Sequence, residues 1–229
     1  MKRTLSLLLI FFIGFLQVAK AQFPYGESYK RSTAPGTIYG QSAALTGGTI
    51  DSGTDGYLRL TSNNPGNQKG YAYSDAKFPA QHGIKAAFEY FTYGGTGADG
   101  FTFFLFDAAV GGAFDQGAYG GSLGYAQSSN VPADYSGPLV GGVVPGLNGG
   151  FLGIGFDEYG NFGPGTEGKG TSTLAADGSF RNNVSTIVPN SIVIRGQDNG
   201  TRAGSSYPFI AGVHTSSGSF TPNLTAANR

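Results

Sequence analysis

Forty glycines in 229 residues leave this chain few ways to fold. Glycine weakens helices, and here glycine, proline, asparagine and serine separate short runs that are rich in aromatic and branched residues. Runs of this kind between turn-forming residues predict strands. With no helix expected after residue 21, we predict an all-β domain, a sandwich of antiparallel sheets. The predicted strands cover residues 57–61, 84–93, 101–106, 151–156, 191–195 and 207–211.

The first residues have the three zones of a secretory signal peptide. Two basic residues precede a nearly unbroken apolar run over residues 5–18, and small residues follow at Ala19 and Ala21. The run is shorter than the ~20 apolar residues of a spanning helix, although an uncleaved anchor is the alternative. The sequence therefore predicts a signal peptide over 1–21 and one domain over 22–229, either secreted or at the cell surface.

The composition of the exported part excludes several classes of function. Cleavage lowers the number of basic residues from 14 to 11 against 14 acidic ones, a net charge of −3, so we expect no nucleic-acid partner. The absence of cysteine excludes thiol catalysis and thiolate metal sites. No later segment is apolar enough to span a membrane. Because the sequence stops at Arg229, soon after the last predicted strand, we expect a domain truncated at its C-terminus.

The densest group of hard oxygen donors follows the predicted strand 151–156. Asp157, Tyr159 and Asn161 alternate, so in an extended chain they point the same way. A carboxylate, a backbone carbonyl and an amide oxygen suit Ca²⁺, and Glu167 offers a second carboxylate. The alternative is an ordinary turn, in which Asp and Asn bond their own backbone.

Two other motifs contain glycine. Asp99 lies between Gly-Ala and Gly, where a lone Asp is usually a turn residue. Gly121 and Ser122 belong to a Gly-Gly-Ser-Leu-Gly sequence that lacks the strand–turn–helix context of a nucleotide-binding loop, but its glycines allow a ligand to approach the backbone. The long connections 107–150 and 162–190 are either variable surface loops or the frame of a binding site.

Catalytic motifs are poorly represented. His82 and His214 belong to no triad and no zinc-binding spacing. Asp157 and Glu158 are adjacent carboxylates, and neighbouring strand residues face opposite sides, whereas glycoside hydrolysis needs two carboxylates that converge on one bond. We therefore predict that the chain is not an enzyme, with a glycoside hydrolase on a related sandwich as an alternative.

Together, four motifs resemble the L-type (legume-type) lectin family in its bacterial branch. They are an Ala-Asp-Gly strand at 98–105, a glycine loop at 120–124, a strand and loop at 151–161 and a strand at 189–196, in the family's order over residues 45–212. The resemblance implies a concanavalin A-like jelly-roll β-sandwich and non-catalytic binding of a glycan or polysaccharide. The expected protein is an exported carbohydrate-binding domain of a larger bacterial surface or secreted protein.

The resemblance also implies roles for five residues at a sugar site. Asp99, after a cis Ala-Asp peptide, would accept hydrogen bonds from sugar hydroxyls. The backbone around Gly121 and Ser122 would donate to the sugar. Asn161 would bind sugar through its amide, and Tyr159 would offer a ring face.

The calcium ligands implied by the resemblance are Asp157, Tyr159, Asn161 and Glu167. Gly155 stands where the family has a Glu, and Ser191 where it has a His, so we expect no Mn²⁺. Glu167 is displaced by one position from the family's second carboxylate, which leaves calcium alone and no metal as the two alternatives. These departures also motivate a second hypothesis, a structural or adhesion sandwich whose sugar site has decayed.

Overall fold

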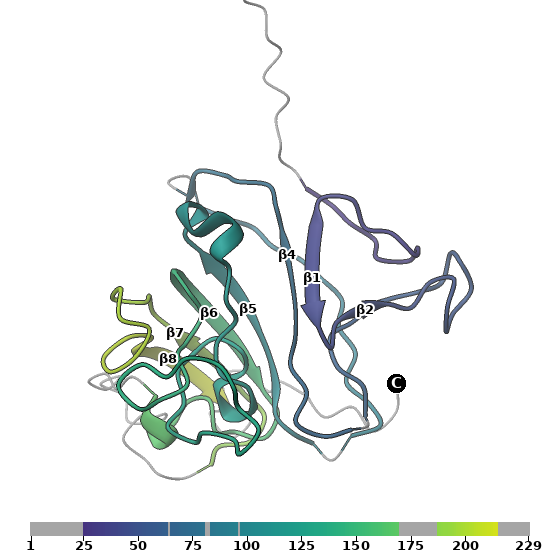
Figure 1. Cartoon of the computed structure of the whole chain (residues 1–229). Helices are drawn as coiled ribbons and strands as arrows, with labels where there is room; N and C mark the ends of the chain where they lie inside the picture. The colour runs from purple at the N-terminus through teal and green to yellow at the C-terminus, as the bar shows by residue number, and fades with distance from the viewer. Residues whose placement is uncertain (1–24, 64, 81–82, 96, 170–186, 215–229) are drawn as a thin grey trace, which may run out of the picture.

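The computed structural model describes residues 25–63, 65–80, 83–95, 97–169 and 187–214, which form strands, loops and short 3₁₀ helices (Figure 1). The strands are β1 (Thr37–Gln41), β2 (Ala44–Leu45), β3 (Leu58–Arg59), β4 (Gly70–Ser74), β5 (Gly100–Phe106), β6 (Gly150–Asp157), β7 (Ser191–Arg195) and β8 (Phe209–His214). The 3₁₀ helices are η2 (Ala108–Ala113), η3 (Gly120–Ser122) and η4 (Thr166–Gly168). Within these ranges no helix has the length and apolar character needed to cross a membrane. The predicted signal peptide lies outside them.

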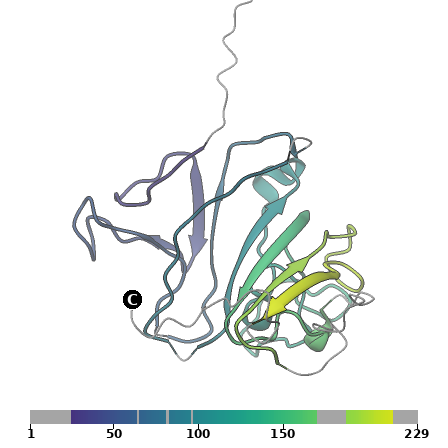
Figure 2. The same ribbon diagram turned by 180° about the vertical axis from the view of Figure 1, so that it is seen from behind.

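All strand pairs of the described chain are antiparallel, which confirms the all-β prediction. β1 pairs with β4 and β2 with β3, whereas β5, β6, β7 and β8 form a four-stranded meander. The meander lies on one side of the molecule and the β1–β4 ribbon on the other (Figures 1 and 2). Asp157, at the end of β6, lies opposite Gly100 of β5 and Ser191 of β7. The loops before β5, after β6 and before β7 therefore meet at one end of the sheet.

Most of the predicted strands belong to this meander. The predictions for 101–106, 151–156 and 191–195 are confirmed by β5, β6 and β7. The strand predicted from residue 207 begins two residues later, as β8. Of the strand predicted over 57–61, only the two residues of β3 form a strand.

The strand predicted over residues 84–93 is wrong, because this segment forms no strand. Instead Phe88 stacks on Phe103 with ring centroids 5.9 Å apart, and the ring of Tyr90 lies 5.0 Å from that of Phe101. The aromatic side chains thus pack on β5 while the backbone stays outside the sheet. Conversely, β1 and β4 were not predicted, because their few apolar residues alternate with glycine and polar residues and do not stand out.

One face of the four-stranded sheet is covered by loops. Gly153 and Gly155 of β6 make room for aromatic rings from those loops, because an added Cβ would lie 2.6 Å from the Tyr125 ring or 2.3 Å from the Phe162 ring. Loop residues therefore supply much of the hydrophobic core on this face. The buried core cluster consists of Tyr125, Ala126, Leu147, Phe162, Val193, Tyr207 and Phe209.

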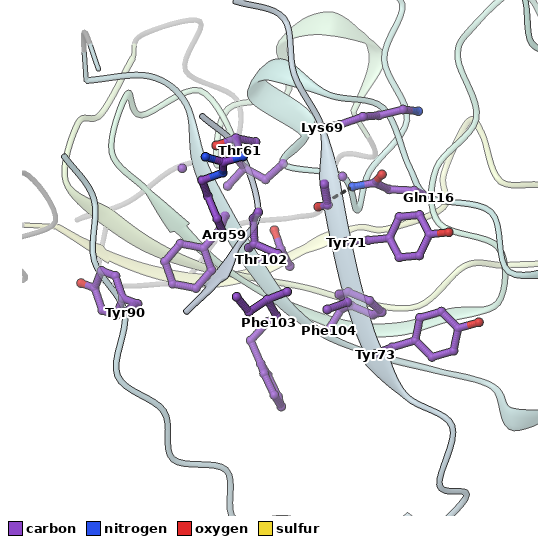
Figure 3. A pocket seen from close by; sticks show the side chains of 18 of the residues that line it. Arg59, Thr61, Lys69, Tyr71, Tyr73, Tyr90, Thr102, Phe103, Phe104 and Gln116 are labelled. Atoms are coloured by element: carbon purple, nitrogen blue, oxygen red, sulfur yellow. Dashed lines mark hydrogen bonds between the residues drawn. The ribbon is translucent and has the colours of Figure 1, made fainter. Parts of the chain in front are cut away.

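The opposite face of the sheet is apolar and only partly buried. Phe101 and Phe156, which are cross-strand partners, stack with their ring centroids 4.7 Å apart. An open cavity of about 2870 Å³ is lined by residues of β4, β5 and the neighbouring loops (Figure 3). Its volume exceeds the ~300–1,000 Å³ of small-molecule pockets, and its lining extends to Asp99 and Asn161 at the end of the sheet. Gln116 crosses to β4, where its amide donates to the Gly70 carbonyl at 3.1 Å.

Candidate functional site

Four segments that are distant in sequence meet where β5 begins and β6 ends. They carry Asp99 before β5, Gly121 in η3, the turn 157–161 after β6, and Glu167 in η4. The Asp99 carbonyl accepts the backbone N–H of Tyr159 at 3.1 Å, which joins the first segment to the third. The structure therefore brings the sugar-binding residues expected from the sequence to one place.

Asp99 is a partly buried carboxylate of the site. The peptide between Ala98 and Asp99 is cis, as expected from the resemblance. Burial raises the pKa of Asp99, the negative charge of Glu167 raises it further, and a hydrogen bond from the side chain of Asn161 opposes both. An added Cβ on Gly120 would lie 3.8 Å from Asp99 Oδ2, so the glycine loop passes directly beside the carboxylate.

The glycine loop is fitted around Asn161. An added Cβ on Gly121 would lie 2.4 Å from the Asn161 side chain, so any other residue at 121 would displace this amide. Ser122 is fully buried, and its hydroxyl donates to the Gln127 carbonyl at 2.8 Å. The Ser122 side chain therefore holds the loop together. The predicted donation from the backbone to a sugar stays a prediction.

Asp157 is fully buried at the end of β6 and closes the turn that follows it. Its Oδ1 accepts the N–H of Gly160 at 2.8 Å, and its Oδ2 accepts the N–H of Phe162 at 2.7 Å. Burial raises the pKa of Asp157 to about 6, although both N–H groups and the charge of Lys169 act in the opposite direction. Asp157 thus acts as a turn residue, the alternative to a metal ligand, because its carboxylate accepts hydrogen bonds from the backbone that follows it.

Tyr159 and Asn161 flank Asp99 on the outer side of the turn. The Tyr159 residue is 41% exposed, which leaves a ring available at the surface. Asn161 is half-buried, and its Oδ1 is a buried acceptor without a hydrogen-bond partner among the described residues. A buried acceptor without a partner is uncommon in folded proteins.

A buried lysine that was not singled out from the sequence belongs to the same group. The Nζ of Lys169 lies 2.7 Å from Glu167 Oε2, and the Lys169 side chain has no exposed surface. Burial lowers the pKa of Lys169, and Glu167 raises it in compensation. The positive charge also interacts with Asp157 and Asp99. In the sequence Lys169 lies between two glycines and resembles any surface lysine.

Arg195 braces the loop that follows Asp157. Its guanidinium is fully buried and donates to the Phe162 carbonyl at 2.9 and 2.8 Å, and to the Tyr207 carbonyl at 2.7 Å. Longer contacts reach the carbonyls of Gly163 at 3.2 Å and Pro164 at 3.4 Å. Burial lowers the pKa of Arg195, but a guanidinium stays charged at neutral pH. From the sequence, Arg195 is predicted only to lie in a strand, and its role as a brace depends on residues of another loop.

The donor set around Asp157 fits a metal ion only in part. Among the described residues no group of three or more His, Cys, Asp or Glu side chains has the arrangement of a metal site. The Phe162 ring fills the space that a Glu at Gly155 would need, and the Ser191 hydroxyl is buried without a hydrogen-bond partner among the described residues. Both Asp157 oxygens and one Glu167 oxygen already accept hydrogen bonds. Asn161 Oδ1 remains as an unpaired acceptor.

The adjacent carboxylates do not form a catalytic pair around one bond. Asp157 is buried in its turn, whereas the side chain of Glu158 accepts a hydrogen bond from Thr92. Of the two histidines, His82 lies outside the described residues and His214 is the last residue of β8.

The comparisons with known proteins assign no family. Searches of protein-family models, curated proteins and solved structures found no match. The lectin resemblance of the motifs therefore stays a prediction, and the geometry of the site carries the functional interpretation.

Proposed function

We propose that this chain is an exported, non-catalytic carbohydrate-binding domain on a concanavalin A-like jelly-roll sandwich. The observation that supports it is the meeting of Asp99, Gly121, Tyr159 and Asn161 from three separate segments. These are the residues to which the lectin resemblance gives contacts with sugar. The domain would act outside the cytoplasm, where glycans and polysaccharides are available.

The chemistry of the four residues suits a sugar ring. A carboxylate such as that of Asp99 accepts charge-assisted hydrogen bonds, which are roughly twice as strong as neutral ones. The half-exposed ring of Tyr159 offers an apolar face to the C–H groups of a pyranose. Gly121 allows the ligand to approach the backbone closely. Because the groups are already joined to one another, little ordering is required when a ligand binds.

The resemblance assigns to calcium the task of fixing the turn that carries Tyr159 and Asn161. Its ligands would be Asp157, Asn161, the Tyr159 carbonyl and Glu167. The same cluster already contains an ammonium group, that of Lys169. Whether calcium or the Lys169 ammonium fixes the turn is therefore a question separate from which ligand the site binds.

Screening of the exported chain on a glycan array tests the proposal. We expect Asp99→Ala and Asn161→Ala to weaken binding of any glycan hit by about 10-fold or more, because a hydrogen bond to a charged group contributes about 1.5–3 kcal/mol. Asp75→Ala, at an exposed acidic residue after β4, is the matched control and should bind normally. A folded wild-type domain that binds no glycan, with or without calcium, would contradict the proposal and favour the structural or adhesion alternative.

A further inference from the structure

We infer that the ammonium group of Lys169 is the resident cation of this site, and that it organises the ligand-binding turn without a bound metal ion. The inference deepens the proposed function and rests on it only where a glycan is used as the readout.

The burial of Lys169 requires a reason. Its side chain has no exposed surface, and lysine is almost never fully buried unless it is paired. The cost of removing an ammonium group from water is several kcal/mol. Here the charge is met by Glu167 at 2.7 Å, and it also interacts with Asp157 and Asp99. Lys169 thus lies among the carboxylates that would otherwise attract a metal.

The charges of the cluster are close to balance without a metal. Three carboxylates, those of Asp99, Asp157 and Glu167, face the buried cations Lys169 and Arg195, both of which interact with Asp157. A divalent ion would turn a net charge of −1 into +1 and would be repelled by both cations. It would also have to displace the Lys169 ammonium from Glu167.

The two cations also perform the mechanical task of a metal. The ion pair between Lys169 and Glu167 ties η4 together, and Asp157 closes the start of the same loop by accepting the N–H groups of Gly160 and Phe162. Arg195 holds the middle of the loop through the Phe162 carbonyl. The loop from β6 to η4, which carries Tyr159 and Asn161, is therefore fixed at its beginning, middle and end. One observation favours a metal ion instead: the Oδ1 of Asn161 is an unpaired acceptor. Two experiments distinguish a bound metal ion from the Lys169 ammonium group.

The first test is thermal unfolding and calorimetry of the exported chain with millimolar CaCl₂ or EDTA. The expected result is no heat of calcium binding and the same Tm in both solutions. A Tm that rises with calcium and falls with EDTA would overturn the inference. Neither readout needs a glycan. A domain that ignores calcium but binds no glycan would contradict only the proposed function, and a calcium-dependent lectin would contradict only this inference.

Substitutions at Lys169 form the second test. Lys169→Met should lower the Tm by about 5 °C, because the partly exposed Glu167 loses its ion-pair partner and the buried Asp157 loses a nearby positive charge. The same variant should gain a Tm that rises with millimolar calcium, since the carboxylates and Asn161 Oδ1 are then free to bind it. Lys169→Arg should stay folded and insensitive to calcium. Lys85→Met, at an exposed lysine, is the control and should leave the Tm unchanged. An equal loss of stability with and without calcium would reduce Lys169 to a purely structural residue and overturn the assignment.

Discussion

The two faces of the four-stranded sheet differ in burial: the loop-covered face, here called the polar face because it carries Asp157, Ser191 and Arg195 beside the hydrophobic core cluster, is buried, whereas the apolar face is only partly buried. On the face under the loops, Asp157, Ser191 and Arg195 are completely inaccessible to solvent. On the other face every large apolar residue keeps part of its surface exposed. These residues are Phe101, Phe103, Leu105, Leu152, Ile154, Phe156, Ile192 and Ile194.

The difference shows that the two faces are stabilised by different forces. Buried polar groups are mostly hydrogen-bonded in folded proteins, and on the polar face Arg195 and Asp157 have backbone partners in the same loop. The apolar face depends on contacts between rings, such as Phe101 with Phe156. The polar face is therefore stabilised by the geometry of specific hydrogen bonds, and the apolar face by the apolar area that is removed from water.

The largest effect is expected from the polar face. Arg195→Met would leave the carbonyls of Phe162 and Tyr207 buried without a donor, so we expect a loss of about 3–5 kcal/mol in the free energy of unfolding, measured in urea. Arg31→Met, at an exposed arginine, should change it by less than about 0.5 kcal/mol. If both variants were equally stable, the polar face would not depend on specific partners.

The second largest effect tests the apolar face. Phe156 contacts the rings of Phe88, Tyr90 and Phe101. Because it is only partly buried, Phe156→Ala should cost about 2–3 kcal/mol, less than a core Phe. Phe151→Ala, on the same strand but 54% exposed, is the control and should cost about 1 kcal/mol or less. A neutral Phe156→Ala would mean that this face contributes little to folding.

A smaller loss is expected where a loop ring meets the sheet. Gly155→Ala places a Cβ 2.3 Å from the Phe162 ring, and overpacking of this kind costs ~1–3 kcal/mol. The midpoint of urea unfolding measures it, and Gly53→Ala, which meets nothing within 4 Å, is the control. Addition of Phe162→Leu should restore part of the loss. Failure of this rescue would show that the Gly155 contact is not the cause.

The smallest change in stability should accompany a clear change in binding. Gly121→Ala presses only on the end of the Asn161 side chain, so we expect less than ~1 kcal/mol of destabilisation. The displaced amide should weaken glycan binding about 10-fold, as measured by calorimetry with an array hit. Gly112→Ala, in η2, where an added Cβ meets nothing within 4 Å, should alter neither quantity. Normal binding by Gly121→Ala would remove Asn161 from the proposed site.

The sequence predicts the apolar face better than the polar one. The run 101–106 is apolar enough to mark β5, and the motif resemblance grouped Asp99 with Asn161. The sequence does not reveal Arg195 as a brace, because its carbonyl partners lie 12 residues away at Tyr207 and 31 to 33 residues away in the loop after β6. For Lys169 the reason is different: its partner Glu167 is only two residues away, but nothing in the local sequence reveals that the charge is buried. The strand expected at 84–93 failed because aromatic alternation reports packing of side chains and not pairing of the backbone.

The glycines of β6 carry a consequence for how this protein can vary over evolution. By admitting Tyr125 and Phe162 onto the sheet, Gly153 and Gly155 make core residues out of loop residues. Insertions and substitutions, which loops normally tolerate, should therefore be rare around these two rings. The strand itself should accept change at Phe151, which is exposed. We expect the natural variation of a residue in this domain to depend on its burial, and not on whether it lies in a strand or a loop.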